Sequence, residues 1–214
     1  MEKTFYQRLV YDFWYFALLI WARIYLRVRF YNRRNVPHTG AVIVISNHQS
    51  FLDPPLIGTS QWRQMYYMAR KTLFKGFFGR LLRTVGAYPV SQDGNAIAGI
   101  KETLKLLKKE QAVLMFPEGS RTEDGRMHTF LGGIVAVAKR AKVPIVPCAV
   151  NGAYRAFPRG AKIPRPYKVT VTFGELIPVE EIQKHSDEEL LRLLTEKVAE
   201  MLWEDAKPEA ESAS

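Results

Sequence analysis

The chain has 214 residues, 47% of them hydrophobic and 24% charged, which suits one ordinary domain with a proper core and excludes global disorder. Its 31 basic and 21 acidic residues give a net charge of +10, which favours an anionic partner such as nucleic acid, an anionic membrane surface or a phosphorylated substrate. Cys148 is the only cysteine, so a disulfide framework and a cysteine-based metal site are excluded, and a reducing compartment fits.

The first predicted element is an aromatic helix within an N-terminal segment of residues 1–26. Residues 13–22 form an uninterrupted apolar run, and Arg23, Arg27 and Arg29 follow it closely. This run is short for a membrane span, which needs about 20 residues, and no signal-peptide cleavage pattern follows it. Aromatic residues beside clustered arginines are typical of a helix that lies in the membrane interface. We favour this interpretation over a helix packed on the protein's own core or a single span.

Strands and helices alternate after this segment and predict an α/β domain over residues 27–205, with a mixed, largely parallel sheet flanked by helices. Strands are expected around residue 28–30 and at 41–46, 65–68, 86–90, 112–116, 144–150 and 167–173, and helices from residue 53 and at 73–84, 95–110, 133–142 and 186–202. The first strand is expected at a sheet edge, and Pro89 confines 86–90 to an edge or interrupted strand. The polar tail 206–214 is expected to be disordered.

The most informative motif is the run NHQSFLD, residues 47–53, which directly follows the apolar strand 41–46. Asp53 opens a proline-marked helix and can hold one imidazole nitrogen of His48 as N–H. The other nitrogen is then free to take a proton near neutral pH. Apart from Ser50 the run holds no obvious nucleophile that this pair would activate. We therefore expect the proton to come from a hydroxyl group on the substrate.

A second polar run, FPEGSR, covers residues 116–121 after the next buried strand. In it Gly119 lets the backbone approach a ligand closely, and Arg121, after Ser120, offers a planar charged fork suited to phosphate. Glu118 can accept from a sugar-alcohol hydroxyl or hold that arginine. Taken alone, this run is equally compatible with an ion-paired loop. Its combination with the histidine motif, each at a strand exit where ligands of α/β sheets gather, is much more specific.

These motifs resemble those of the glycerolipid acyltransferase family, the 1-acylglycerol-3-phosphate (lysophosphatidate) acyltransferases of phospholipid synthesis. Residues 47–53 match the family's first block, NHxSxxD, and residues 116–121 match its third block, FPEGxRS/T. Residues 86–90 resemble the second block and residues 143–147 the fourth. The resemblance covers about residues 28–180 and implies a glycerolphosphate acyltransferase-like fold.

The resemblance implies transfer of a fatty acyl group from a thioester of CoA or acyl-carrier protein to the free hydroxyl of 1-acylglycerol-3-phosphate, which gives phosphatidate. His48 would be the general base, Asp53 would orient it, and the hydroxyl would attack the thioester directly. Ser50 is then a helix cap or a supporting residue rather than a nucleophile. Residues 118–121 would bind the phosphorylated acceptor. No cofactor and no metal are implied besides the acyl donor as co-substrate.

One position departs from the family pattern. The second block usually ends with an arginine that grips the acceptor phosphate, and Gln92 stands at that place. Since glutamine has no charge, another cation such as Arg121 or Lys71 holds the phosphate, or the acceptor is a different lysolipid. Gln92 and Lys71 therefore join the predicted substrate-binding residues. A smaller departure is Leu131, where the family often has a lysine.

A non-catalytic basic module that binds nucleic acid or membrane is the other class of function that fits the net charge. The intact set His48, Asp53 and Glu118 argues against it, and no nucleic acid is expected as a partner. The expected partners are the acyl donor, a lysophospholipid acceptor and an anionic membrane surface. We expect a peripheral or monotopic protein at the cytoplasmic face of a membrane, with the basic stretch 155–168 facing anionic lipid.

Overall fold

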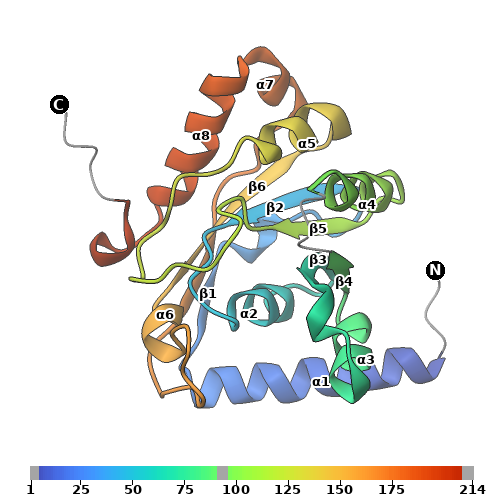
Figure 1. The fold of residues 1–214 in the computed structure, drawn as a ribbon, viewed down its shortest axis with the longest axis vertical. Helices are drawn as coiled ribbons and strands as arrows, with labels where there is room; N and C mark the ends of the chain where they lie inside the picture. The colour runs from blue at the N-terminus through green and yellow to red at the C-terminus, as the bar shows by residue number, and fades with distance from the viewer. Residues whose placement is uncertain (1–4, 91–95, 209–214) are drawn as a thin grey trace.

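The computed structural model describes residues 5–90 and 96–208, which form a seven-stranded sheet between two layers of helices (Figure 1). The strands are β1 (Arg29–Tyr31), β2 (Val42–Ser46), β3 (Met65–Arg70), β4 (Ala87–Val90), β5 (Ala112–Met115), β6 (Ile145–Asn151) and β7 (Thr170–Phe173). Their order across the sheet is β1-β7-β6-β2-β5-β3-β4. Every neighbouring pair is parallel except β6 and β7. The predicted mixed, largely parallel sheet is confirmed.

Helices cover both faces of this sheet. One layer holds α1 (Phe5–Ile24), α2 (Asp53–Thr59), α3 (Gly76–Thr84) and the short α6 (Ala153–Ala156), and the other holds α4 (Ala96–Lys108), α5 (Gly133–Ala141), α7 (Val179–Lys184) and α8 (Asp187–Ala199) (Figure 1). Each layer has its own hydrophobic cluster because successive side chains of a strand point to opposite faces. In β2, Val42 and Val44 join the cluster under α1, and Ile43 and Ile45 join the one under α5.

The position of each strand in the sheet explains its composition. β2 is central, and all five of its residues are buried because helices cover both faces of a parallel sheet. The predicted edge strands are confirmed, since β1 and β4 are the two outermost strands. Pro89 is tolerated in β4 because this strand has only β3 as a neighbour. In β1, Arg29 is exposed as expected for a basic residue on an edge strand.

Three details differ from the sequence prediction. The short helices α6 and α7 lie in segments for which no helix was predicted. β7 begins at Thr170 rather than at residue 167. The packed chain also extends into the predicted tail, because Ala206 has a side chain small enough to enter the cluster under α5 and is 4% exposed. Its carbonyl oxygen accepts from the Met127 N–H group at 2.9 Å.

Strand direction determines where the candidate site forms. β2, β3, β4, β5 and β6 are mutually parallel, so their carboxyl ends lie at the same edge of the sheet. His48 follows β2, Lys71 follows β3 and Glu118 follows β5. Gln92, which follows β4 in the sequence, lies outside the described residues. The predicted site residues that the structure describes therefore share one edge.

Candidate active site

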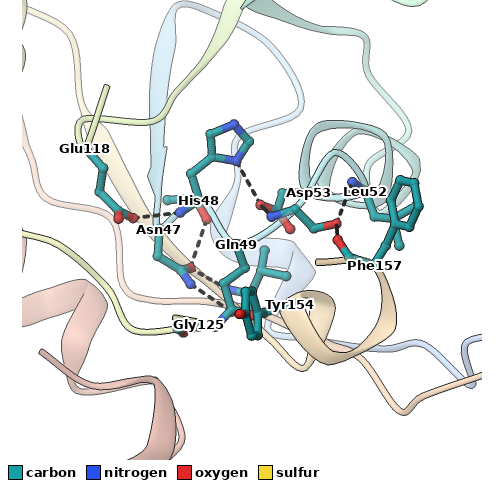
Figure 2. A network of polar contacts seen from close by, with 12 residues as sticks. Asn47, His48, Gln49, Leu52, Asp53, Glu118, Gly125, Tyr154 and Phe157 are labelled. Atoms are coloured by element: carbon teal, nitrogen blue, oxygen red, sulfur yellow. Dashed lines mark hydrogen bonds and ion pairs between the residues drawn. The ribbon is translucent and has the colours of Figure 1, made fainter. Parts of the chain in front are cut away.

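The first block places a histidine and an aspartate in direct contact at the end of β2. Asp53 is the first residue of α2, and the next two positions are prolines, which suit a first helical turn because it has no use for their missing N–H groups. The His48 Nδ1 atom lies 2.8 Å from Asp53 Oδ2, with the aspartate fully buried and the histidine side chain 18% exposed (Figure 2). The predicted pairing of these two residues is thus present in the structure.

The surroundings of this pair define which ring nitrogen faces outward. Asp53 Oδ2 also accepts the Ser50 N–H group at 2.7 Å, while Oδ1 has no hydrogen-bond partner among the described residues. A carboxylate can only accept, so it selects the tautomer that carries the proton on His48 Nδ1. The imidazole ring stacks on Phe116 with the ring centroids 4.0 Å apart. Nε2 forms no hydrogen bond within the described chain, so this nitrogen is available as a base.

Ser50 supports the loop between β2 and α2. It is fully buried, its Oγ atom donates to the Phe157 carbonyl oxygen at 2.7 Å, and the same Oγ accepts from the Leu52 N–H group at 3.2 Å. The predicted helix-cap role is wrong, because the N-cap position of α2 is Leu52 and no side chain caps it. The hydroxyl group holds two separate backbone segments together, which matches a supporting residue.

The other polar side chains of the first block bind the backbones of neighbouring segments (Figure 2). Asn47 exchanges two hydrogen bonds with the main chain of Val150 in β6, at 2.9 and 2.8 Å. Gln49 donates to the Gly125 carbonyl oxygen at 2.9 Å and accepts from the Tyr154 N–H group at 3.4 Å. These bonds fix the end of β2 against β6, against the loop after β5 and against α6.

Glu118 holds backbone groups rather than an arginine or an open ligand position. It is 8% exposed, and its Oε1 and Oε2 atoms accept the N–H groups of His48 and His128 at 2.7 and 2.9 Å. Burial raises the pKa of Glu118 to about 8, although the two backbone N–H groups oppose this shift. The carboxyl group therefore joins the loop of residues 47–52, called the catalytic loop below after the role proposed for His48, to the loop that follows β5. This role was missed because backbone donors leave no pattern in a sequence.

The rest of the third block lies beside the first block. Gly119 and Ser120 are exposed, and Gly119 has φ +75°, a conformation that favours glycine. The guanidinium carbon of Arg121 lies 3.5 Å from the centroid of the Phe51 ring. Burial lowers the pKa of Arg121, and the positive charges of Arg159 and Arg70 lower it further. Arg121 thus contacts the first block through Phe51. Its charge also interacts with those of two arginines, Arg70 and Arg159, that the sequence analysis did not assign to the site.

Lys71 and Leu131, the two other positions that the sequence analysis discussed, both lie on the surface. Lys71 is exposed at the start of a single 3-10 turn after β3, and its ammonium group forms no hydrogen bond or ion pair within the described chain. Leu131 is also exposed, and its Cδ1 atom would lie 2.9 Å from a Cβ atom at Gly119. Residues 5–90 and 96–208 hold no group of three or more His, Cys, Asp or Glu side chains that could bind a metal ion.

An oriented base at the carboxyl edge of an α/β sheet fits an enzyme, and a comparison with protein families identifies its class. The Acyltransferase family model matches residues 27–151, more than half of the chain. The chain therefore belongs to the acyltransferase family and is an acyltransferase. The family predicted from the sequence motifs is confirmed, and a non-catalytic binding module is set aside.

Individual relatives agree with this class. The 1-acyl-sn-glycerol-3-phosphate acyltransferase of Bacillus subtilis is 29% identical over 180 residues, which are 83% of this chain and 87% of the relative. The enzyme of the same name from Streptococcus pneumoniae is 31% identical over 176 residues, 80% of this chain and 63% of the relative. The crystal structure of the 1-acyl-sn-glycerophosphate acyltransferase of Thermotoga maritima has a TM-score of 0.74 and 26% identity, and the match covers 90% of this chain and 76% of that chain.

Proposed function

We propose that this acyltransferase moves a fatty acyl group from a thioester of CoA or acyl-carrier protein to the free hydroxyl group of 1-acylglycerol-3-phosphate, giving phosphatidate. The observation that carries the proposal is the 2.8 Å contact between His48 Nδ1 and Asp53 Oδ2, which leaves Nε2 without a hydrogen bond among the described residues. Relatives named for this acceptor, which match most of the chain, support the choice of substrate.

The geometry suggests direct transfer. Nε2 of His48 takes the proton of the acceptor hydroxyl as its oxygen attacks the thioester carbonyl carbon. A C–O bond forms, the C–S bond breaks, and the imidazolium returns the proton to the leaving thiolate. Asp53 stabilises the transient imidazolium through Oδ2. Ser50 is fully buried and occupied by two hydrogen bonds, which supports a mechanism without an acyl-enzyme.

The test is a transfer assay with purified protein, lysophosphatidate and either acyl-CoA or acyl-carrier-protein thioester. His48→Ala is expected to lower kcat by roughly 10²- to 10⁴-fold, the usual contribution of a general base, with an unchanged circular dichroism spectrum. His38→Ala is the matched control, because His38 is exposed and precedes β2, at the opposite edge of the sheet. Full transfer by His48→Ala would rule out this base.

A different lysolipid acceptor is the second candidate, and Gln92 favours it because the usual phosphate-gripping arginine is absent there. A panel of lysolipids with head groups of different charge separates the two candidates. A clear preference for an acceptor other than lysophosphatidate would support the second candidate. In that case Gln92→Arg is expected to improve the use of lysophosphatidate.

We also propose that α1 binds the interface of a membrane, with the protein at its cytoplasmic face. Within the described residues, no helix has the length and hydropathy needed to span a bilayer. α1 packs against α2 and α3 with one side. Its other side presents large apolar side chains at intervals of three and four residues, which form a continuous exposed row: Phe13, Phe16, Ile20 and Ile24. Such a row fits lipid better than water.

Sedimentation with anionic liposomes tests this location. The double variant Phe13→Gln, Ile20→Gln removes two apolar contacts from the exposed row and leaves Tyr15 and Ala22 on the packed side. It is expected to sediment less than the wild type, while transfer to substrate in detergent micelles persists. Wild-type sedimentation of the variant would contradict the anchor.

A further inference from the structure

The segment 154–159, which runs from within α6 into the connection to β7, is bonded to the loop of the first block although it belongs to none of the four family blocks. The Phe157 carbonyl oxygen accepts the Ser50 hydroxyl at 2.7 Å, which ties the segment to the first block. The Tyr154 hydroxyl donates to the Glu123 carbonyl oxygen at 2.7 Å, which ties it to the loop after β5. Figure 2 shows Phe157 and Tyr154 beside the first block. These contacts fix the segment next to the base.

Arg159 extends from this segment toward the loop of the third block. Its Nη1 atom lies 2.5 Å from the Glu123 carboxylate, two residues after Arg121. The ion pair is exposed, with 52% and 76% of the two side chains accessible, so it orients Arg159 without locking it. Because Glu123 is two residues from Arg121, this ion pair brings Arg159 toward Arg121, and the charge of Arg159 acts on the Arg121 guanidinium.

Arg70 brings a third positive charge to the same place. It ends β3, at the sheet edge where the catalytic loop lies, and its charge acts on the Arg121 guanidinium as that of Arg159 does. The nearby carboxylates are already engaged, since Glu123 pairs with Arg159 and Asp53 is bonded to His48. Arg121 is thus repelled by two other guanidinium groups, and an anion that binds beside it offsets this repulsion.

We propose that Arg159 determines acceptor specificity by completing, with Arg121 and Arg70, the site for the phosphate group of the acceptor. A phosphate monoester carries nearly two negative charges near pH 7 and offers three acceptor oxygens, which several guanidinium groups can satisfy together. The inference rests on the proposed function and deepens it. It also supplies the positive charge that Gln92 lacks, from a segment outside the second block.

Kinetics in neutral detergent micelles test the inference with two acceptors that differ only in the phosphate, lysophosphatidate and monoacylglycerol. Arg159→Ala is expected to raise the KM for lysophosphatidate about tenfold, the loss of one charge-assisted hydrogen bond. kcat and the residual transfer to monoacylglycerol are expected to stay unchanged, and Arg159→Lys is expected to recover part of the affinity. Lys162→Ala is the matched control, because it removes one exposed cation from the same connection.

Each other outcome overturns the inference in a recognisable way. An unchanged KM in Arg159→Ala shows that the phosphate binds elsewhere. An equal rise of the KM for monoacylglycerol shows that the role of Arg159 is purely structural. A rise in KM that appears only on anionic vesicles, and not in neutral micelles, shows that Arg159 contacts membrane lipid instead of the acceptor.

A binding experiment keeps this inference separate from the proposed function. If the wild type transfers nothing to lysophosphatidate, the proposed function fails. Calorimetric binding of glycerol 3-phosphate to the full chain then decides the inference. Binding that weakens in Arg159→Ala and not in Lys162→Ala supports the phosphate site, and equal binding to both variants, or none to the wild type, overturns it.

Discussion

Replacing Glu118 by glutamine separates the charge of this buried carboxyl group from its shape. The folded-state pKa of about 8 lies above the value of 4.5 that applies to an unperturbed glutamate. Between these values Glu118 is protonated in the folded chain and ionised in the unfolded chain. Its contribution to the free energy of unfolding is therefore greatest below pH 4.5 and is lost as the pH rises through 8. The slope is about 1.4 kcal/mol per pH unit, which amounts to roughly 2 kcal/mol between pH 6 and pH 7.5.

The amide of glutamine does not titrate, so Glu118→Gln removes this slope. It also leaves one of the two backbone N–H groups, at His48 or His128, facing an NH₂ group, which costs about 1–3 kcal/mol. At pH 6 the variant is therefore expected to be less stable than the wild type. By pH 7.5 the difference is expected to shrink by roughly 2 kcal/mol, because only the wild type loses stability.

Urea unfolding followed by tryptophan fluorescence at the two pH values measures this change in the difference. The other titratable groups contribute equally to the two proteins, so their contributions cancel in the difference between the two free energies of unfolding. Glu180→Gln, at an exposed position of α7, controls for the loss of one carboxyl group and is expected to follow the wild type. Parallel pH dependences of Glu118→Gln and the wild type would refute the reasoning. In the transfer assay Glu118→Gln is expected to lower kcat more than it raises the KM. A change in KM alone would instead support the direct contact between Glu118 and the acceptor that was predicted from the sequence.

Three further substitutions test the supports of the site. Asp53→Asn keeps an acceptor for the Ser50 N–H group but loses the charge that stabilises the imidazolium, and kcat in the transfer assay is expected to fall at least about 100-fold. Asn47→Ala leaves the buried main chain of Val150 without two partners, and urea unfolding is expected to show a loss of about 2 kcal/mol or more. Gly152→Ala would put a Cβ atom 2.3 Å from the Lys168 carbonyl oxygen at φ +82°, so thermal unfolding is expected at a clearly lower temperature.

The sheet and its main helices could be predicted because long patterns report burial directly. Five consecutive apolar residues at 41–45 indicated a buried strand, and Pro89 indicated an edge or interrupted strand. The capping box of Ser186 and Glu189 marked the start of α8 and is present in the structure. By contrast, α6 and α7 have four and six residues, too few for a helical period to emerge.

The candidate site likewise contains contacts that the sequence predicted and contacts that it could not predict. The spacing of His48 and Asp53 predicted their contact because a strand exit followed by a helix start brings both side chains to one loop. The partners of Glu118 are two backbone N–H groups that lie 70 and 10 residues away, and no side-chain pattern announces them. Arg159 was interpreted as facing lipid because its neighbours in the sequence are basic, and its position beside Arg121 depends on tertiary contacts alone.

Five hydrogen bonds of residues 47–50 run from side chains of this block to main-chain atoms of other segments. Each such bond dictates the amino acid on one side and leaves the amino acid on the other side open, because every residue offers a carbonyl oxygen and nearly every residue an N–H group. These bonds thus constrain the side chains of residues 47–50, whereas Val150, Tyr154 and Phe157 take part in them through main-chain atoms alone. Other contacts decide which side chains those three positions need, such as the core packing of Val150 and the bond from the Tyr154 hydroxyl to Glu123. A substitution at one of these partner positions can therefore leave intact the bonds that support the contact between His48 and Asp53.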